Sequence, residues 1–302
     1  MLLKKTLQLF CLLVMASFGV QAQEDDVLRI NTDLVVLNVT VTDNAGKYVR
    51  GLKVTDFKIF EDGKEVPISS ISNFGLHETP FASVVLLDTS GSMDTRITLA
   101  RSAAIRFLDG LREEDVAAVY RFDTKIERLQ DFSSGRDLAP LAYGIKATGM
   151  TVLNDAIVTA AKALTARPEQ RKAIVVLSDG LDTYSSASSS KALDQALALG
   201  AGIYTVDMSA TDGAASRNAQ SAAILRNFAE KSGARFVATP GGQALRDAFA
   251  GISEELGHQY TIAYRPLNRT RDGKWRNIEV KVAREAVNVR TRKGYRASKR
   301  DS

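Results

Sequence analysis

The chain has 302 residues, of which 45% are hydrophobic and 25% charged, and its formal net charge is +5. This composition excludes a disordered chain and predicts a sizeable hydrophobic core, with about two domains expected for this length. One cysteine and two histidines exclude a disulfide framework and a zinc cluster, and they leave little material for Cys–His or Ser–His catalysis.

The N-terminal segment, residues 1–22, has the features of a secretory signal peptide. Lys4 and Lys5 precede an apolar run that ends at Val20, and Val20 and Ala22 are small residues suited to a cleavage site. The run is shorter than the roughly 20 apolar residues that a membrane span needs. We therefore expect an exported protein, periplasmic or secreted, that is not integral to the membrane after cleavage; a retained anchor is the alternative.

Residues 23–79 are predicted to be a β-rich segment. The run LVVLNVTVTD is typical of a strand, and DNAG follows it as a turn. Between FKIFE and KEVPI stands Asp62-Gly63, the strongest short signal for a two-residue hairpin. This segment is too short to build a large core alone.

Residues 80–258 are predicted to be one α/β domain. Strand-like and helix-like patterns alternate along this stretch, and KIERLQDF is expected to be an edge strand. The apolar strand patterns are SVVLLD, VAAVYRF, KAIVVLSD, GIYTVDM and RFVAT. The helical patterns are RITLARSAAIRFLDGL, LNDAIVTAAKAL, KALDQALAL, SAAILRNFAEKS and GQALRDAFAGISEEL. Strands that alternate with helices predict a doubly wound, mostly parallel sheet with helices on both faces.

Residues 259–302 return to a β pattern, with strands in QYTIAYRP, WRNIEVKVA and VNVRTRKGYRA. We expect the two β-rich flanks to pair into one small β-sandwich around an inserted α/β domain; two independent appendages are the alternative. Basic residues gather after residue 265. Because no base-stacking motif accompanies these basic residues, we expect no nucleic-acid partner and interpret them as solvated faces of strands. Contact with anionic surface polymers or lipid head groups is the alternative.

Oxygen-bearing side chains stand where predicted strands end. Asp88 ends SVVLLD and is followed at every second position by Ser90 and Ser92. Asp179 ends the strand in KAIVVLSD, and Thr151 precedes the helix in LNDAIVTAAKAL. Ligands of open parallel sheets bind beyond the carboxyl ends of the strands, at the point where strand order reverses. If the two aspartates end the central strands, all five side chains reach one crevice.

An all-oxygen donor set selects a hard divalent cation, with Mg²⁺ the first expectation and Mn²⁺ or Ca²⁺ also possible. Two carboxylates neutralise a dication, and an outside carboxylate can then replace a bound water. The alternative is a simple strand-to-helix turn, in which Ser92 or Asp94 caps a helix that begins near Thr95. Asp182, Thr183 and the serine run 185–190 could line the rim of the site or cap a helix, and Tyr184 is a candidate contact residue.

These five positions resemble the metal-ion-dependent adhesion site (MIDAS) of von Willebrand factor A (VWA) domains, and the alternation over residues 80–258 resembles their fold. The resemblance implies that Ser90, Ser92 and Thr151 are hydroxyl ligands and that Asp88 and Asp179 bind directly or through water. It implies one metal, because SMDTR lacks the acidic run of relatives that hold a second cation. It also implies that the helix in GQALRDAFAGISEEL moves on ligand binding. The flanks, with DFKIFEDGKEV and RTRKGY, resemble a group of exported VWA-related proteins found mainly in acidobacteria.

Three functions from different classes follow. The leading hypothesis is an exported protein-binding or adhesion module, which is not an enzyme and docks an Asp or Glu of a protein partner through the cation. A structural or assembly protein, in which the metal only stabilises the fold, is the alternative. A hydrolase is the third, because LLDTSGS superficially resembles the D-T-G-S of aspartic proteases; however, Ser90 interrupts that motif and no second copy exists. The sequence does not predict an oligomeric state.

Overall fold

The computed structural model describes residues 34–72, 79–135, 138, 144–179, 182–209, 215–238 and 242–298. The predicted signal peptide lies outside the described residues. Residues 33–302 form one compact unit. No helix in the described part of the chain is long and apolar enough to cross a membrane.

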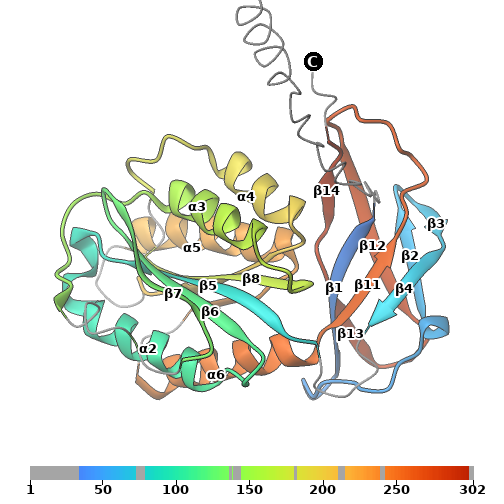
Figure 1. Ribbon diagram of the computed structural model, residues 1–302, viewed down its shortest axis with the longest axis horizontal. Helices are drawn as coiled ribbons and strands as arrows, with labels where there is room; N and C mark the ends of the chain where they lie inside the picture. Colours follow the sequence, from blue (N-terminus) through green and yellow to red (C-terminus); the bar gives the residue numbers. More distant parts are fainter. Residues whose placement is uncertain are drawn as a thin grey trace, which may run out of the picture. The chain divides into compact units, whose positions relative to one another are not determined.

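A six-stranded sheet forms the centre of the α/β region (Figure 1). All neighbouring strands run parallel except the last pair, in which β7 is antiparallel, as predicted for an edge strand. In order across the sheet, the strands are β10 (Phe236–Ala238), β9 (Gly202–Asp207), β8 (Arg171–Ser178), β5 (Phe81–Asp88), β6 (Val116–Phe122) and β7 (Ile126–Ser133).

Helices cover both faces of this sheet, which confirms the predicted mostly parallel α/β architecture. On one face lie α2 (Ile97–Asp109) and α6 (Gly242–His258); on the other lie α3 (Leu153–Thr165), α4 (Ser189–Ala198) and α5 (Ala215–Ser232) (Figure 1). Successive residues of β5 serve opposite cores: Val85 packs with the α2 and α6 side, and Val84 packs with the α3, α4 and α5 side. This explains why β5 reads as a continuous apolar run.

The centre of the sheet is the point where strand order reverses. After β5 the chain adds β6 and β7 on one side and then crosses to β8, which pairs with the other edge of β5. The register aligns Leu87 with Leu177, so both strands end at the same level. Side chains that follow these two strands therefore lie at the same edge of the sheet.

Strands from both flanks pair with one another in two four-stranded sheets that share one hydrophobic core. Asp62 and Gly63 have φ of 48° and 79°, which confirms the predicted hairpin turn between β2 and β3. One sheet has the order β13 (Val287–Arg290), β1 (Val35–Asp43), β11 (Tyr260–Tyr264), β4 (Ile68–Ser72); the other has β14 (Gly294–Arg296), β12 (Trp275–Val282), β2 (Phe57–Glu61), β3 (Lys64–Val66).

The α/β region lies in the chain between two neighbouring strands of one flank sheet. Strand β4 pairs antiparallel with β11, and Ser72 is opposite Thr261. In most such pairs a short turn joins the two strands, whereas here the α/β region stands in place of that turn.

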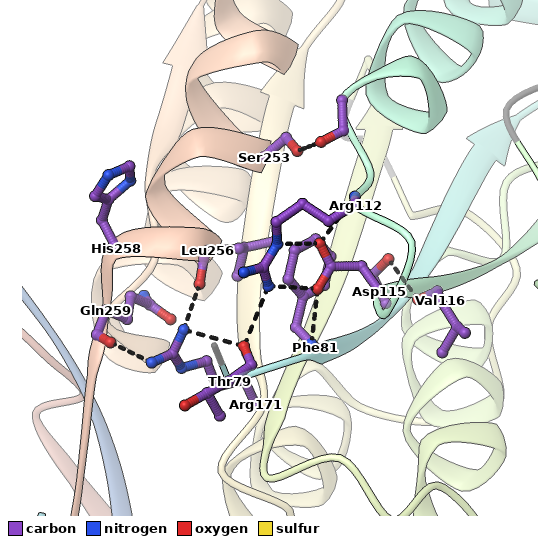
Figure 2. A network of polar contacts seen from close by, with 12 residues as sticks. Thr79, Phe81, Arg112, Asp115, Val116, Arg171, Ser253, Leu256, His258 and Gln259 are labelled. Atoms are coloured by element: carbon purple, nitrogen blue, oxygen red, sulfur yellow. Dashed lines mark hydrogen bonds and ion pairs between the residues drawn. The ribbon is translucent and has the colours of Figure 1, made fainter. Parts of the chain in front are cut away.

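A fully buried arginine holds the two ends of the α/β region together (Figure 2). The Arg171 guanidinium, at the start of β8, donates hydrogen bonds to the carbonyls of Thr79 (3.3 Å), Leu256 (3.2 Å) and Gln259 (2.6 Å) and to the Thr261 hydroxyl (3.1 Å). Burial lowers the pKa of Arg171 to about 10, so the group remains charged at neutral pH. We refer to Arg171 and these four partners as the arginine clasp.

A second ion pair fixes the start of β5 beside the arginine clasp (Figure 2). Arg112 pairs with the buried carboxylate of Asp115 at 2.6 Å and also donates to the Thr79 carbonyl at 3.2 Å. Asp115 in turn accepts the backbone N–H of Phe81 at 3.1 Å. The first residue of the central strand is therefore held by a charge-assisted hydrogen bond.

The expectation that the C-terminal basic residues lie on solvated faces is wrong for Arg276 and Arg292, which are buried. Arg292 donates to the Leu197 carbonyl near the end of α4 at 2.5 Å, and Arg276 pairs with Asp272 at 3.0 Å. Because a helix end leaves its last carbonyls without intrahelical partners, a buried guanidinium is a suitable donor there. These arginines belong to the interior of the fold.

Candidate functional site

Asp88 is the last residue of β5 and is fully buried. Its Oδ1 accepts the backbone N–H of Ser90 at 2.9 Å, and its Oδ2 accepts the hydroxyl of Ser178 at 2.5 Å. Ser178 ends β8, the strand beside β5. The two central strands therefore position this carboxylate from both sides, and each oxygen keeps a lone pair for a further ligand.

The charge of Asp88 has no basic counterpart among the residues that the structure describes. Burial raises the pKa of Asp88 from its ordinary 3.8 to about 6; hydrogen bonds from Ser178 and Ser90 lower it, and the nearby charge of Asp179 raises it. Within the described ranges, no lysine or arginine forms an ion pair with Asp88. A buried carboxylate without a partner is costly, and a cation beside it would remove that cost.

Ser90 and Ser92 lie together, with 3.1 Å between their Oγ atoms. Ser90 directly precedes a 3₁₀ turn, η2 (Gly91–Arg96), and Ser92 lies within it, before α2 begins at Ile97. Neither helix start has a side-chain capping hydrogen bond, so the alternative that Ser92 or Asp94 caps a helix is wrong. The two serine hydroxyls are instead hydrogen-bonded to each other, and Ser90 also donates its N–H to Asp88.

The loop that carries Thr151 is held against the serine turn by its backbone. The N–H of Thr148 donates to the Thr89 carbonyl at 2.8 Å, and the N–H of Gly91 donates to the Gly149 carbonyl at 3.1 Å. Thr151 itself is buried and precedes α3. These bonds bring the loop beside the residues that follow β5.

The loop after β8 lies against the loop that carries Thr151. Asp179 is half-buried directly after Ser178. Further along, Asp182 Oδ2 accepts the N–H of Asn154 at 2.7 Å, at the start of α3, and Ser188 caps α4 by accepting the N–H of Lys191. Ser188 is a helix cap, as expected for the end of this polar loop, whereas Asp182 accepts an N–H of the first turn of α3 from a separate loop.

Thr183 and Tyr184 join that loop to Thr151. Both donate their backbone N–H groups to the Thr151 carbonyl at 3.0 Å, and the Thr183 hydroxyl accepts the N–H of Thr151 at 3.0 Å. The Tyr184 side chain remains 60% exposed. Tyr184 therefore presents an exposed side chain from a backbone position beside Thr151.

Two residues with a role in this geometry were missed from the sequence. The Ser178 hydroxyl orients Asp88, and its signal was a polar residue at the end of an otherwise apolar strand in VVLSDG. The Thr124 hydroxyl accepts the backbone N–H of Met150 at 3.0 Å, and nothing in the local sequence marks that contact.

The donor set fits a hard cation by its chemistry. In the described part of the chain, no three His, Cys, Asp or Glu side chains gather as a metal cluster. A cation here would depend on two carboxylates, Asp88 and Asp179, with hydroxyls for the remaining protein ligands. Such a set suits Mg²⁺, which keeps several waters and binds through one or two carboxylates.

The described part of the chain is a doubly wound α/β protein, with oxygen-bearing side chains where the strand order reverses. The sequence profile of the von Willebrand factor type A domain family matches residues 83–181, a stretch that includes all five candidate ligands. No curated protein matches the chain.

Solved structures show a similar fold. The von Willebrand factor type A protein from Catenulispora acidiphila has a TM-score of 0.50 and 13% identity, covering 90% of this chain and 76% of that one. The pilus adhesin SpaC from Lactobacillus rhamnosus GG, in its open conformation, has a TM-score of 0.50 and 11% identity over 85% of this chain and 49% of its own. The PilB minor pilin from Streptococcus sanguinis has a TM-score of 0.47 and 16% identity, covering 60% of this chain and 62% of that one. The chain thus spans less than two thirds of both pilus proteins.

Proposed function

We propose that this chain is an exported protein-binding module that docks an acidic residue of a protein partner through a divalent cation. The observation that carries the proposal is Asp88, a fully buried carboxylate with only neutral donors around it and the negative charge of Asp179 nearby. Such an arrangement is unfavourable in an empty site and favourable around a cation. The profile match over residues 83–181 supports a VWA domain with a metal-ion-dependent adhesion site.

Each residue has a defined part in this proposal. Asp88 and Asp179 supply the two negative charges, while Ser90, Ser92 and Thr151 supply neutral oxygens. When bound, the cation supplies an electrophilic position that a carboxylate from outside can occupy. Asp88 and Asp179 together already neutralise the charge of the dication, and water fills the coordination positions that the protein leaves open. The incoming carboxylate therefore competes mainly with water for such a position.

The proposal extends to the rest of the chain. The signal peptide predicted over residues 1–22 is the basis for proposing export, and the flank motifs are the basis for proposing membership of the exported VWA-related group found mainly in acidobacteria. We further propose that the two flank sheets, with their shared core, form one β-sandwich. We assign no catalytic residue, because in this proposal the five oxygen-bearing side chains serve as ligands of the cation.

The test is calorimetric titration of Mg²⁺ into the purified, metal-stripped protein. We expect one site, absent in Asp88→Ala and retained in Asp109→Ala, which removes an exposed carboxylate at the end of α2. Mg²⁺ binding that survives in Asp88→Ala would refute the site. A cation that raises the melting temperature but leaves partner binding unchanged would favour the structural role instead.

A further inference from the structure

Two exposed apolar side chains flank Thr151 at the rim of the candidate cation site. Met150 precedes Thr151 in the chain and is 49% exposed, and Tyr184, hydrogen-bonded through its N–H to the Thr151 carbonyl, is 60% exposed. Among the described residues, the large hydrophobic side chains with such exposure are Leu34, Val54, Met150, Tyr184 and Leu267. Two of these five therefore lie at one place, beside the proposed docking point.

The backbone beneath both side chains is fixed. The N–H of Met150 donates to the Thr124 hydroxyl at 3.0 Å, and Gly149 has a φ of +77°. A Cβ at Gly149 would lie 2.4 Å from the Thr124 hydroxyl, so the loop conformation that presents Met150 requires glycine. Met150 thus stays exposed on a loop that is held in place, rather than on a segment free to bury it.

Such a pair is suited to contact with another protein. Methionine adapts to irregular apolar surfaces, and tyrosine offers a large contact area for little loss of conformational entropy. Both residue types are enriched at protein interfaces. Met150 and Tyr184 therefore place an apolar pair beside the position that is proposed to accept a carboxylate.

We propose that the partner presents its Asp or Glu next to an apolar residue, and that this apolar side chain packs between Met150 and Tyr184. This inference rests on the proposed function and specifies the partner's chemistry. The partner's carboxylate makes the contact depend on the metal. The apolar neighbour lets the site distinguish one acidic segment from another, which a charge alone does not do. A second copy of the chain and a lipid surface are the competing occupants.

The test is selection from a phage-displayed peptide library with a fixed central aspartate and random flanking residues, in Mg²⁺ and in EDTA. With the unmodified protein in Mg²⁺, we expect enrichment of apolar residues next to the aspartate. In the double variant Met150→Ser and Tyr184→Ser, we expect that enrichment to vanish and the affinity of the selected peptides to fall about tenfold. Calorimetric Mg²⁺ affinity of the double variant should be unchanged, because neither side chain is a proposed ligand.

The matched control is Val54→Ser with Leu267→Ser, which removes exposed apolar surface from the flank sequences and should leave selection unchanged. If phage recovery depends on Mg²⁺ but the selected peptides show no enrichment of apolar residues next to the aspartate, this inference is overturned and the proposed function still stands. Recovery that is equal in Mg²⁺ and EDTA would overturn both. A dimer of the unmodified protein that becomes monomeric in the double variant, or binding to phosphatidylglycerol vesicles that the variant loses, would assign the pair to a competing occupant.

Discussion

Asp88→Asn tests the reasoning about the cation site most directly, because it removes the charge and keeps the shape. An asparagine amide can accept the N–H of Ser90 and donate to the hydroxyl of Ser178. The folded pKa of Asp88 is raised to about 6, so the carboxyl's favourable contribution to stability is present below its ordinary pKa of 3.8 and lost as pH rises through 6. At neutral pH the metal-free protein therefore bears the cost of a buried charge, about 3 kcal/mol at 1.36 kcal/mol per pKa unit. In EDTA, the variant should be more stable than the unmodified protein by about 1–3 kcal/mol.

Added Mg²⁺ should reverse this order. A ligand at 100 times its dissociation constant stabilises the folded state by about 2.7 kcal/mol, and only the protein with Asp88 should gain it. Urea denaturation followed by circular dichroism, at neutral pH with EDTA or Mg²⁺, measures both differences. Asp109→Asn, on the exposed end of α2, is the control and should respond to Mg²⁺ as the unmodified protein does. Two results would refute the reasoning: a variant that is less stable in EDTA, or equal stabilisation of both proteins by Mg²⁺.

Three further variants test separate features. Ser178→Ala removes the hydroxyl that orients Asp88 and should weaken Mg²⁺ binding about 10- to 100-fold by calorimetry; an unchanged affinity would show that the hydroxyl has no orienting part. Arg171→Met leaves buried carbonyls without a donor and should lower the free energy of unfolding by about 3–5 kcal/mol in urea, whereas a loss near zero would mean that water replaces the guanidinium. Gly149→Ala forces an L-residue into positive φ and should cost about 1–3 kcal/mol, while Gly144→Ala, where a Cβ meets nothing within 4 Å, should cost little; equal thermal shifts would contradict the strain.

The sequence predicted the sheet, and the neighbouring positions of the residues that end its central strands, because both depend on local pattern. Continuous apolar runs identified the buried strands, and the polar residues that end them identified Asp88 and Asp179 at neighbouring strand ends. Whether those residues bind a cation stays a prediction, as do the domain boundaries at residues 79/80 and 258/259. The capping alternative at Ser92 was wrong because a 3₁₀ turn intervenes before α2, and a short run of residue types does not specify where such a turn gives way to a helix.

What the sequence could not predict depends on contacts between distant segments. Arg171 and Arg292 look like ordinary surface arginines in their local context, yet each is buried against the C-terminal end of a helix. Arg171 lies 85 residues from its Leu256 partner, and Arg292 lies 95 from Leu197. No periodicity relates positions so far apart, so only the assembled fold shows which arginines serve as buried donors.

Under the proposed function the α/β region is the recognition element, and its insertion in place of a turn between β4 and β11 makes that element exchangeable. Because Ser72 is opposite Thr261, the flank strands could be joined by a few residues without changing their register. Conversely, the ends of the α/β region meet at the arginine clasp, so it could be transplanted between the strands of another hairpin. Arg171 and the carbonyls of Thr79 and Gln259 would be transferred together, so the same hydrogen bonds could form in the new host. A host of this kind could acquire a new binding specificity by replacing one contiguous stretch of chain, while its own core stays intact.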